Sequence, residues 1–253
     1  MSVRTDCSVS AKVHPSPNHN ERRDATTIDM LVLHYTGMQD GTSALQRLCD
    51  PRAEVSAHYL VEEDGSILQC VPEARRAWHA GKSFWKGVTD LNSCSIGIEI
   101  VNPGHAWGYR PFPDAQVQAV IALCADICAR HRIAPWRVLA HSDIAPERKE
   151  DPGELFPWDR LAANEIGHFV PPLPVTGGRF FQQGESGQPI EALQSMLAIY
   201  GYNIAVNGEY DAQTTAVVTA FQRHFRPERV DGIADASTIA TLHALLTSLP
   251  DLA

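Results

Sequence analysis

The sequence has no long apolar run and no excess of positive charge. None of its 253 residues belongs to a stretch approaching the roughly 18 consecutive apolar residues of a membrane span, and the first twenty residues lack the apolar core of a signal peptide. The formal net charge is −9, which argues against broad attraction to nucleic acid or to an anionic membrane. We therefore expect no nucleic-acid binding and no membrane insertion, and the sequence indicates no obligate protein partner.

Paired cysteines of the CxxC type are also missing. The six cysteines stand at positions 7, 49, 70, 94, 124 and 128. Cys124 and Cys128 fall on the apolar face of an expected helix, where a small buried hydrophobe is a commoner role than a ligand or a disulfide partner. Reduced thiols, without a signal sequence or a lipid-attachment motif, favour a cytoplasmic location. The alternative is the periplasm or cell envelope, reached by a non-standard route.

What the sequence does contain is a set of metal-binding residue types at the ends of apolar runs. His34 and His141 each follow a short apolar run, and Asp151 comes ten residues after His141 in an irregular, Pro-containing loop. Two imidazoles and one carboxylate leave the fourth position of a tetrahedral zinc ion free for water, which is typical of catalytic rather than structural zinc. We predict one zinc ion per chain, bound by His34, His141 and Asp151.

Four separated motifs carry a family resemblance that extends from Thr26 to Ile166. In order, they are LVLHYTG, AWHAG, SIGIEIVN and AHSDIAPERKEDPG. The chain resembles the zinc-dependent type 2 N-acetylmuramoyl-L-alanine amidases, which are related to peptidoglycan recognition proteins and T7-type lysozyme. The resemblance is specific because four motifs agree. It implies an α/β fold in which a mixed central β-sheet is flanked by helices.

Two further residues are candidates for catalysis. Glu99 lies on the strand face opposite Ile96, Ile98 and Ile100, and a buried carboxylate needs a partner. A salt bridge within the sheet would satisfy it, whereas the resemblance implies a proton shuttle facing the zinc-bound water. Lys149 matches the family's catalytic lysine and would stabilise the oxyanion; the alternative is a surface lysine in a charged loop.

Five residues are candidates for substrate contact. Trp78 and His79 lie in a Gly-flanked aromatic loop suited to stacking on a sugar and bonding a carbonyl, although a packing role for Trp78 fits equally well. His58 is interpreted as a hydrogen-bonded histidine of the sheet that lines the wall of the site, in preference to a zinc ligand. Tyr35 and Asn92 complete the predicted set.

Composition and periodicity divide the chain into four parts. We predict an N-terminal surface segment over 1–25, a zinc amidase domain over 26–167, a Pro/Gly linker over 168–179 and a small all-α three-helix domain over 180–253. Within the second part, strands are expected over 27–35, 57–61, 66–71, 94–101 and 136–140, and helices over 41–49, 114–131 and 157–166.

The last part contains an imperfect internal repeat. Val206–Gln222 and Val230–Leu246 share a turn followed by an aspartate, and Asp211 and Asp235 fit as helix N-caps. The pattern resembles the small peptidoglycan-binding domain attached to wall hydrolases. Three arginines between the repeats are interpreted as solvated charge in preference to a binding face: Arg223, Arg226 and Arg229.

The expected function is hydrolysis of the amide bond between N-acetylmuramic acid, in its ordinary or 1,6-anhydro form, and L-alanine of the stem peptide. The expected setting is peptidoglycan recycling or turnover, with a muropeptide or peptidoglycan as the substrate partner. One alternative is an envelope amidase that acts on polymeric peptidoglycan. A non-catalytic peptidoglycan receptor is disfavoured, because the chain keeps all three candidate ligands together with Glu99 and Lys149.

Overall fold

The computed structural model describes residues 4–23, 26–174, 178 and 180–250, and its centre is a six-stranded β-sheet. The strand order is β1-β5-β4-β7-β3-β8, and neighbours are parallel except β5 and β4. These strands are β1 Ala11–Val13, β3 Met30–Tyr35, β4 Tyr59–Val61, β5 Ile67–Gln69, β7 Ser95–Ile100 and β8 Val138–Ala140. A second, antiparallel sheet pairs β2 (His19–Glu21) with β6 (Arg75–Ala77).

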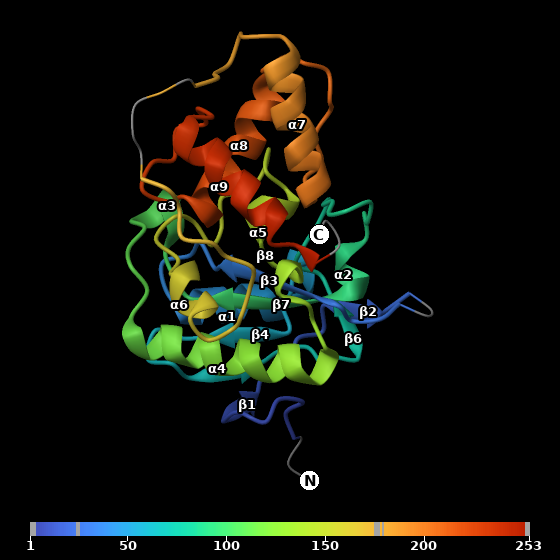
Figure 1. Ribbon diagram of the computed structural model, residues 1–253. Helices are drawn as coiled ribbons and strands as arrows, with labels where there is room; N and C mark the ends of the chain where they lie inside the picture. Colours follow the sequence, from blue (N-terminus) through green and yellow to red (C-terminus); the bar gives the residue numbers. More distant parts are fainter. Residues whose placement is uncertain (1–3, 24–25, 175–177, 179, 251–253) are drawn as a thin grey trace.

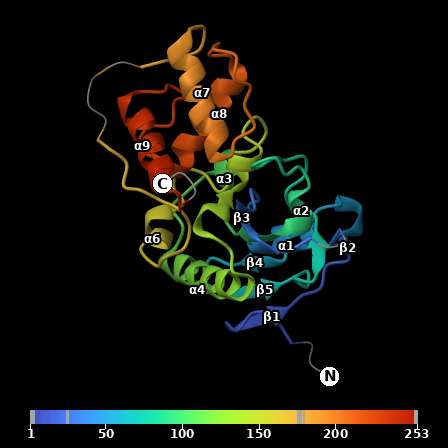
Figure 2. The same cartoon turned by 45° about the vertical axis from the view of Figure 1, so that its right-hand side comes forward.

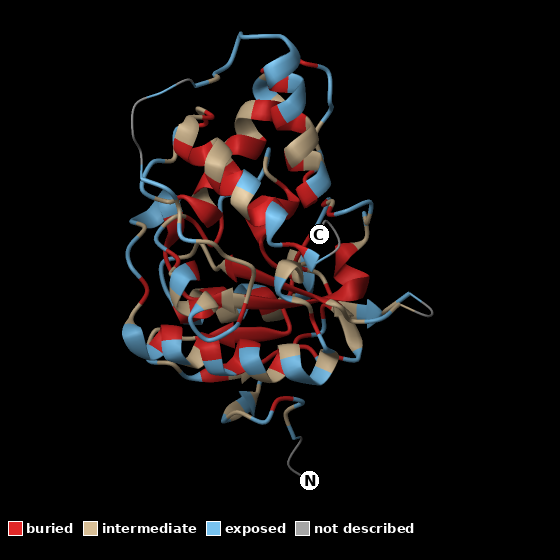
Figure 3. Cartoon of the chain, viewed as in Figure 1, coloured by how far each residue is buried: buried red, intermediate tan, exposed pale blue. Residues whose placement is uncertain are grey.

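One face of the central sheet is covered by the long helix α4 (Asp114–His131). Parallel strands are usually covered on both faces, and Leu31, Leu33 and Ile98 supply this face of the core, in contact with Val117 and Val120 of α4. Figures 1 and 2 show α4 running along this side of the sheet. In Figure 3 its buried and exposed residues alternate around the helix, as expected of an amphipathic helix.

The opposite face is covered by C-terminal helices: α7 Gln188–Tyr200, α8 Ala212–Phe225 and α9 Ala236–Thr247. Met30 and Val32 point to this face because strand side chains alternate. They belong to one continuous apolar cluster with Trp85, Leu139 and the buried residues of α7, α8 and α9. Both views show the three helices on the side of the sheet opposite α4. The sheet and the C-terminal helices therefore share a core.

Shorter helices connect these layers: α1 Gly41–Cys49, α2 Leu91–Cys94, α3 Gly104–Trp107, α5 His141–Ile144 and α6 Trp158–Ala162. The α/β architecture with a helical C-terminal region is confirmed. No helix in the described ranges is both long and apolar enough to cross a membrane.

The C-terminal helices begin where the sequence predicts. Asp211 accepts a hydrogen bond from the Thr214 amide, and Asp235 accepts one from the Thr238 amide, so both N-caps are confirmed. The solvated role expected for Arg226 is wrong. This side chain is fully buried and contacts Asp235, because the turn between the two repeats folds the guanidinium against the N-terminus of α9.

The N-terminal segment, expected to lie on the surface, contributes two short strands. β1 pairs in parallel with β5, and β2 pairs with β6. Strand pairing uses backbone N–H and C=O groups, so it needs little side-chain signal. β2 is polar throughout, whereas in β1 Ala11 and Val13 alternate with Lys12 over a run too short to predict a strand. Residues 1–3 and 24–25 of this segment lie outside the described residues.

Candidate metal and catalytic site

Neighbouring parallel strands bring the predicted site residues to one edge of the sheet. The register of β3 on β7 places His34 directly beside Glu99. On the other side of β3, β8 ends at Ala140, and His141 begins α5. Ligands of open α/β sheets gather at the carboxyl ends of the strands. Residues more than 100 positions apart in the sequence therefore meet here.

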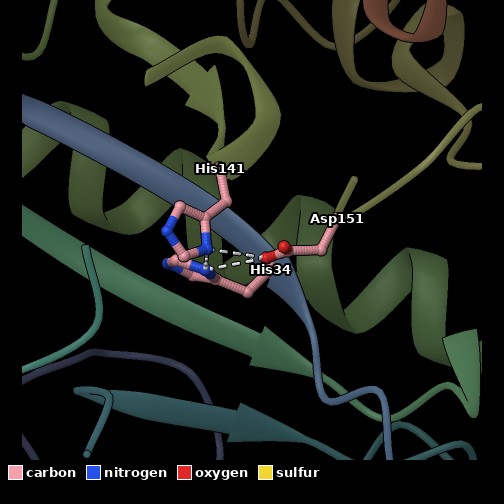
Figure 4. Close-up of side chains that lie close together, drawn as sticks. All are labelled: His34, His141 and Asp151. Carbon is pink, nitrogen blue, oxygen red and sulfur yellow. Dashed lines mark hydrogen bonds and ion pairs between the residues drawn. The ribbon is translucent and has the colours of Figure 1, made fainter. Parts of the chain in front are cut away.

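Three ligand-type atoms converge at this edge (Figure 4). The Nδ1 atoms of His34 and His141 lie 2.8 Å apart, and each lies close to Oδ2 of Asp151, at 3.0 and 2.9 Å. All three side chains are buried. The Ser142 amide also donates a 3.0 Å hydrogen bond to the Asp151 carbonyl, which ties the two segments that carry His141 and Asp151.

A relay of hydrogen bonds sets the tautomer of His34. The Ser95 hydroxyl donates to the Leu91 carbonyl at 2.5 Å, so its oxygen is free to accept the Nε2 proton of His79 at 3.2 Å. Nδ1 of His79 is then an acceptor for the Nε2 proton of His34, at 3.0 Å. In the neutral ring this assignment leaves Nδ1 of His34 without a proton.

The same logic applies to His141. Its Nε2 lies 3.2 Å from the Ala80 carbonyl, which can only accept, so Nε2 carries the proton and Nδ1 presents a lone pair. Burial, reinforced by the neighbouring His141, lowers the pKa of His34 to about 4. Three lone pairs of buried side chains therefore face one point, an arrangement that repels unless a cation lies between them. The residues fit a metal ion.

A cavity of about 430 Å³ opens beside the three ligands. Its walls include Glu99 and Lys149 along with His79, His141 and Asp151. Oε2 of Glu99 is buried and has no hydrogen-bond partner among the described residues. Burial, together with the charge of Asp151, raises the pKa of Glu99 well above its usual range, and Lys149 opposes this effect. A carboxyl group with a raised pKa is suited to accept and return a proton during a reaction.

The predicted substrate-contacting residues divide into two groups. Tyr35 and His79 line the cavity, and the Tyr35 hydroxyl lies 3.0 Å from Nδ1 of His105. Trp78, His58 and Asn92 are not among the residues that line it. The Trp78 indole donates to Asn20.

His58 and Asn92 support the site from outside the cavity. His58 is fully buried, and its Nδ1 accepts a hydrogen bond from the Gly97 amide. The hydrogen bond fits the interpretation of a sheet histidine, but His58 does not line the wall of the cavity as that interpretation expected. The side-chain oxygen of Asn92 accepts from the amides of His79 and Ala80. Asn92 therefore holds the loop that contains His79 and Ala80. The His79 side chain orients His34, and the Ala80 carbonyl orients His141.

Gly97 has a role in the site that the sequence analysis missed. A Cβ atom built on Gly97 would lie 2.4 Å from Cγ of His79, so the imidazole of His79 lies directly on the backbone of β7. A glycine inside an apolar strand is a sign of close approach by another group. The glycine in SIGIEIV was therefore the available signal.

The fold and the site define the class of protein. A buried place for one metal ion, next to a buried carboxyl group and a lysine that line the same cavity, is the arrangement of a hydrolytic enzyme. A family model described as N-acetylmuramoyl-L-alanine amidase matches residues 24–154, and one described as a peptidoglycan binding domain matches residues 186–242. The chain belongs to the N-acetylmuramoyl-L-alanine amidase family.

Known relatives are similar to this chain in sequence and structure over most of its length. The N-acetylmuramoyl-L-alanine amidase AmiD of Escherichia coli K12 is 44% identical over 234 residues, which cover 87% of this chain and 82% of AmiD. The structure of AmiD with the substrate anhydro-N-acetylmuramic acid-L-Ala-D-γ-Glu-L-Lys has a TM-score of 0.75 at 41% identity, covering 90% of this chain and 92% of AmiD. AmpDh3 of Pseudomonas aeruginosa with anhydromuramic pentapeptide has a TM-score of 0.72 at 28% identity, covering 98% of each chain.

Proposed function

We propose that the protein is a zinc-dependent amidase that hydrolyses the bond between N-acetylmuramic acid and L-alanine in soluble, anhydro-type muropeptides during peptidoglycan recycling. The observation that carries the proposal is the convergence of His34, His141 and Asp151 on one point beside Glu99 and Lys149. The substrate follows from two relatives, whose structures contain anhydromuramyl peptides.

Zinc is the metal that suits this donor set. Two neutral imidazoles and one carboxylate are typical ligands of catalytic zinc, whereas Mg²⁺ and Ca²⁺ prefer oxygen ligands. When bound, zinc polarises the scissile carbonyl and lowers the pKa of water. His79 and the Ala80 carbonyl keep the two histidines in the tautomers that such binding requires.

Glu99 and Lys149 supply the remaining chemistry. We assign Glu99 to accept a proton from the attacking water and to deliver it to the leaving amide nitrogen as the C–N bond breaks. Lys149 contributes its positive charge beside the oxygen of the tetrahedral intermediate. Both side chains border the same cavity as His141 and Asp151, so one bound substrate can contact all of them.

The test offers zinc-loaded protein two substrates side by side, soluble anhydromuropeptides and intact sacculi, and follows the released stem peptides by mass spectrometry. We expect cleavage of the soluble fragments, and loss of activity and of bound zinc in His34→Ala, His141→Ala and Asp151→Ala. Full activity after exhaustive dialysis against a chelator would refute the metal assignment.

A second candidate function is an envelope amidase that acts on polymeric peptidoglycan. The match of residues 186–242 to a peptidoglycan binding domain favours it. Efficient release of peptides from sacculi would support this candidate over recycling. The cytoplasmic location stays a prediction, and fractionation of cells that produce the full chain would test it.

A further inference from the structure

Helix α8, in the C-terminal region, reaches the segments that carry two of the three proposed metal ligands. Nδ1 of His224 lies 2.7 Å from Oδ2 of Asp143, which stands two residues after His141. The preceding residue, Arg223, lies 3.5 Å from Glu150 and 3.6 Å from Glu154, on either side of Asp151. Two consecutive residues of one helix thus contact both ligand-bearing segments.

Asp143 is the centre of the first contact. Its carboxylate is fully buried and accepts three hydrogen bonds. The Tyr202 hydroxyl donates to Oδ1 at 2.7 Å, and the Ala140 amide and His224 share Oδ2 at 2.8 and 2.7 Å. A buried carboxylate is tolerated only when it is fully bonded. Two of its three partners come from the C-terminal region.

The bond from Asp143 to Ala140 matters for the site. Ala140 is the N-cap of α5, and Asp143 is the third residue of this one-turn helix, so the bond closes the turn that begins with His141. If His224 or Tyr202 is lost, the carboxylate keeps an unsatisfied lone pair in an apolar environment. It can regain a partner only by turning, which weakens its bond to Ala140 and loosens the turn.

The surroundings of His224 hold it in one position. Its ring stacks on Trp158 of α6 with the ring centroids 3.7 Å apart, and on Phe225 at 3.8 Å. Its side chain is only 2% exposed. These two stacked rings hold the donor of His224 in place against Asp143.

We propose that His224 and Tyr202 are positioning residues of the metal site, which hold Asp143 and through it the turn that presents His141. The C-terminal helices then support the active site through Asp143. The inference rests on the proposed metal site, because it concerns how His141 is presented to the ion.

The experiment measures zinc affinity directly, by competition with a chromophoric chelator, in the full chain. Tyr202→Phe removes only the hydroxyl, and His224→Phe keeps the stacked ring without the donor. We expect each to weaken zinc binding several-fold and by about 10-fold at most, because loss of a group bonded directly to a metal ligand costs about 10–100-fold and these two act on His141 through Asp143. His224→Asn, whose amide can donate from the position of Nδ1, should restore most of the affinity.

The matched control is Gln194→Leu. Gln194 is equally buried in the C-terminal region and bonds Asn207, Gly208 and Thr214 without contact to Asp143. It should lower the melting temperature and leave zinc affinity unchanged.

Three outcomes would be decisive. Unchanged affinity in both Tyr202→Phe and His224→Phe would overturn the inference, and so would an equal loss in Gln194→Leu. Failure of the unmodified chain to bind zinc would instead overturn the proposed metal site. The direct binding measurement therefore separates the two failures.

Discussion

At the scale of single residues, the site depends on how closely His79 lies on the sheet. Its two ring nitrogens are engaged by His34 and Ser95, and its ring lies on the backbone of Gly97. We therefore regard His79 as a residue that orients His34, in addition to its place in the cavity wall. The orientation of His34 therefore depends on where the His79 ring lies as well as on the hydrogen bonds that the ring makes.

We predict that Gly97→Ala displaces His79 and weakens zinc binding. The added Cβ would lie 2.4 Å from the ring, and overpacking of this kind costs about 1–3 kcal/mol of unfolding free energy. Thermal and urea unfolding measure the stability, and chelator competition measures the affinity. The control adds Gly97→Ala to the His79→Ala variant, in which the imidazole that the new Cβ would clash with is absent. An equal cost of Gly97→Ala in both backgrounds would contradict the prediction.

We further predict that Glu99→Gln and Lys149→Met retain zinc but lose turnover. Loss of a general acid or base costs about 10²–10⁴ in rate, and loss of an oxyanion-stabilising group costs about 10²–10³ in kcat. Steady-state kinetics and metal content by mass spectrometry provide the readouts. Glu147→Gln, an exposed carboxylate of the same loop, should keep normal kinetics. Loss of metal in either site variant would reassign that residue as a ligand.

At the scale of elements, helix α4 is joined to the turn before β6 by a buried ionic cluster around Glu73. Its carboxylate accepts hydrogen bonds from Arg130, His131 and Tyr59. Burial by itself would raise the pKa of Glu73, but these hydrogen bonds outweigh it and lower the pKa from 4.5 to about 2. The ionised form therefore stabilises the fold.

The sign of the pH dependence follows from this lowered pKa. The stabilisation by Glu73 is fully present above about pH 4.5 and is lost as the pH falls towards 2. We predict that Glu73→Gln reduces the unfolding free energy at pH 7 by at most about 3 kcal/mol, with a smaller difference at pH 3.5. Urea unfolding at both pH values measures it. Glu63→Gln, which breaks a surface pair with Arg110, should cost under about 1 kcal/mol. An equal effect of Glu73→Gln on the unfolding free energy at both pH values would contradict the lowered pKa of Glu73.

At the scale of the whole molecule, the catalytic and C-terminal regions share one apolar core. Trp85 is fully buried, with ring centroids 5.9 Å from Tyr200 and 5.0 Å from Tyr202. Gly201 packs against the same indole, and its carbonyl accepts a 3.0 Å hydrogen bond from the Lys86 amide. Separation of the two regions would expose this core to water.

We predict that the catalytic and C-terminal regions stay associated after the segment that connects them is cleaved. A protease site inserted within residues 171–174, which are mostly exposed, allows cleavage of the folded protein. The two fragments should then elute together in size-exclusion chromatography because the shared core holds them. The chain without the inserted site, treated with the same protease, is the control. Separate elution of the fragments would show that the two regions are independent modules.

Local pattern predicted the longer elements and the candidate site residues of this protein. Apolar runs ending in His34 and His141 marked strand ends, and aspartates before periodic segments marked the starts of α8 and α9. Such signals are readable because capping and side-chain alternation act over two to four residues. The family motifs added Glu99 and Lys149, whose roles stay predictions.

Tertiary structure alone decided how these pieces depend on one another. The relay from Ser95 through His79 to His34 joins two strands and a loop, and the contact between Asp143 and His224 spans 81 positions. The three-residue strands β1 and β2 likewise form only because β5 and β6 offer backbone partners. No periodicity encodes such contacts, because their energy comes from burial and from groups that the folded chain brings together.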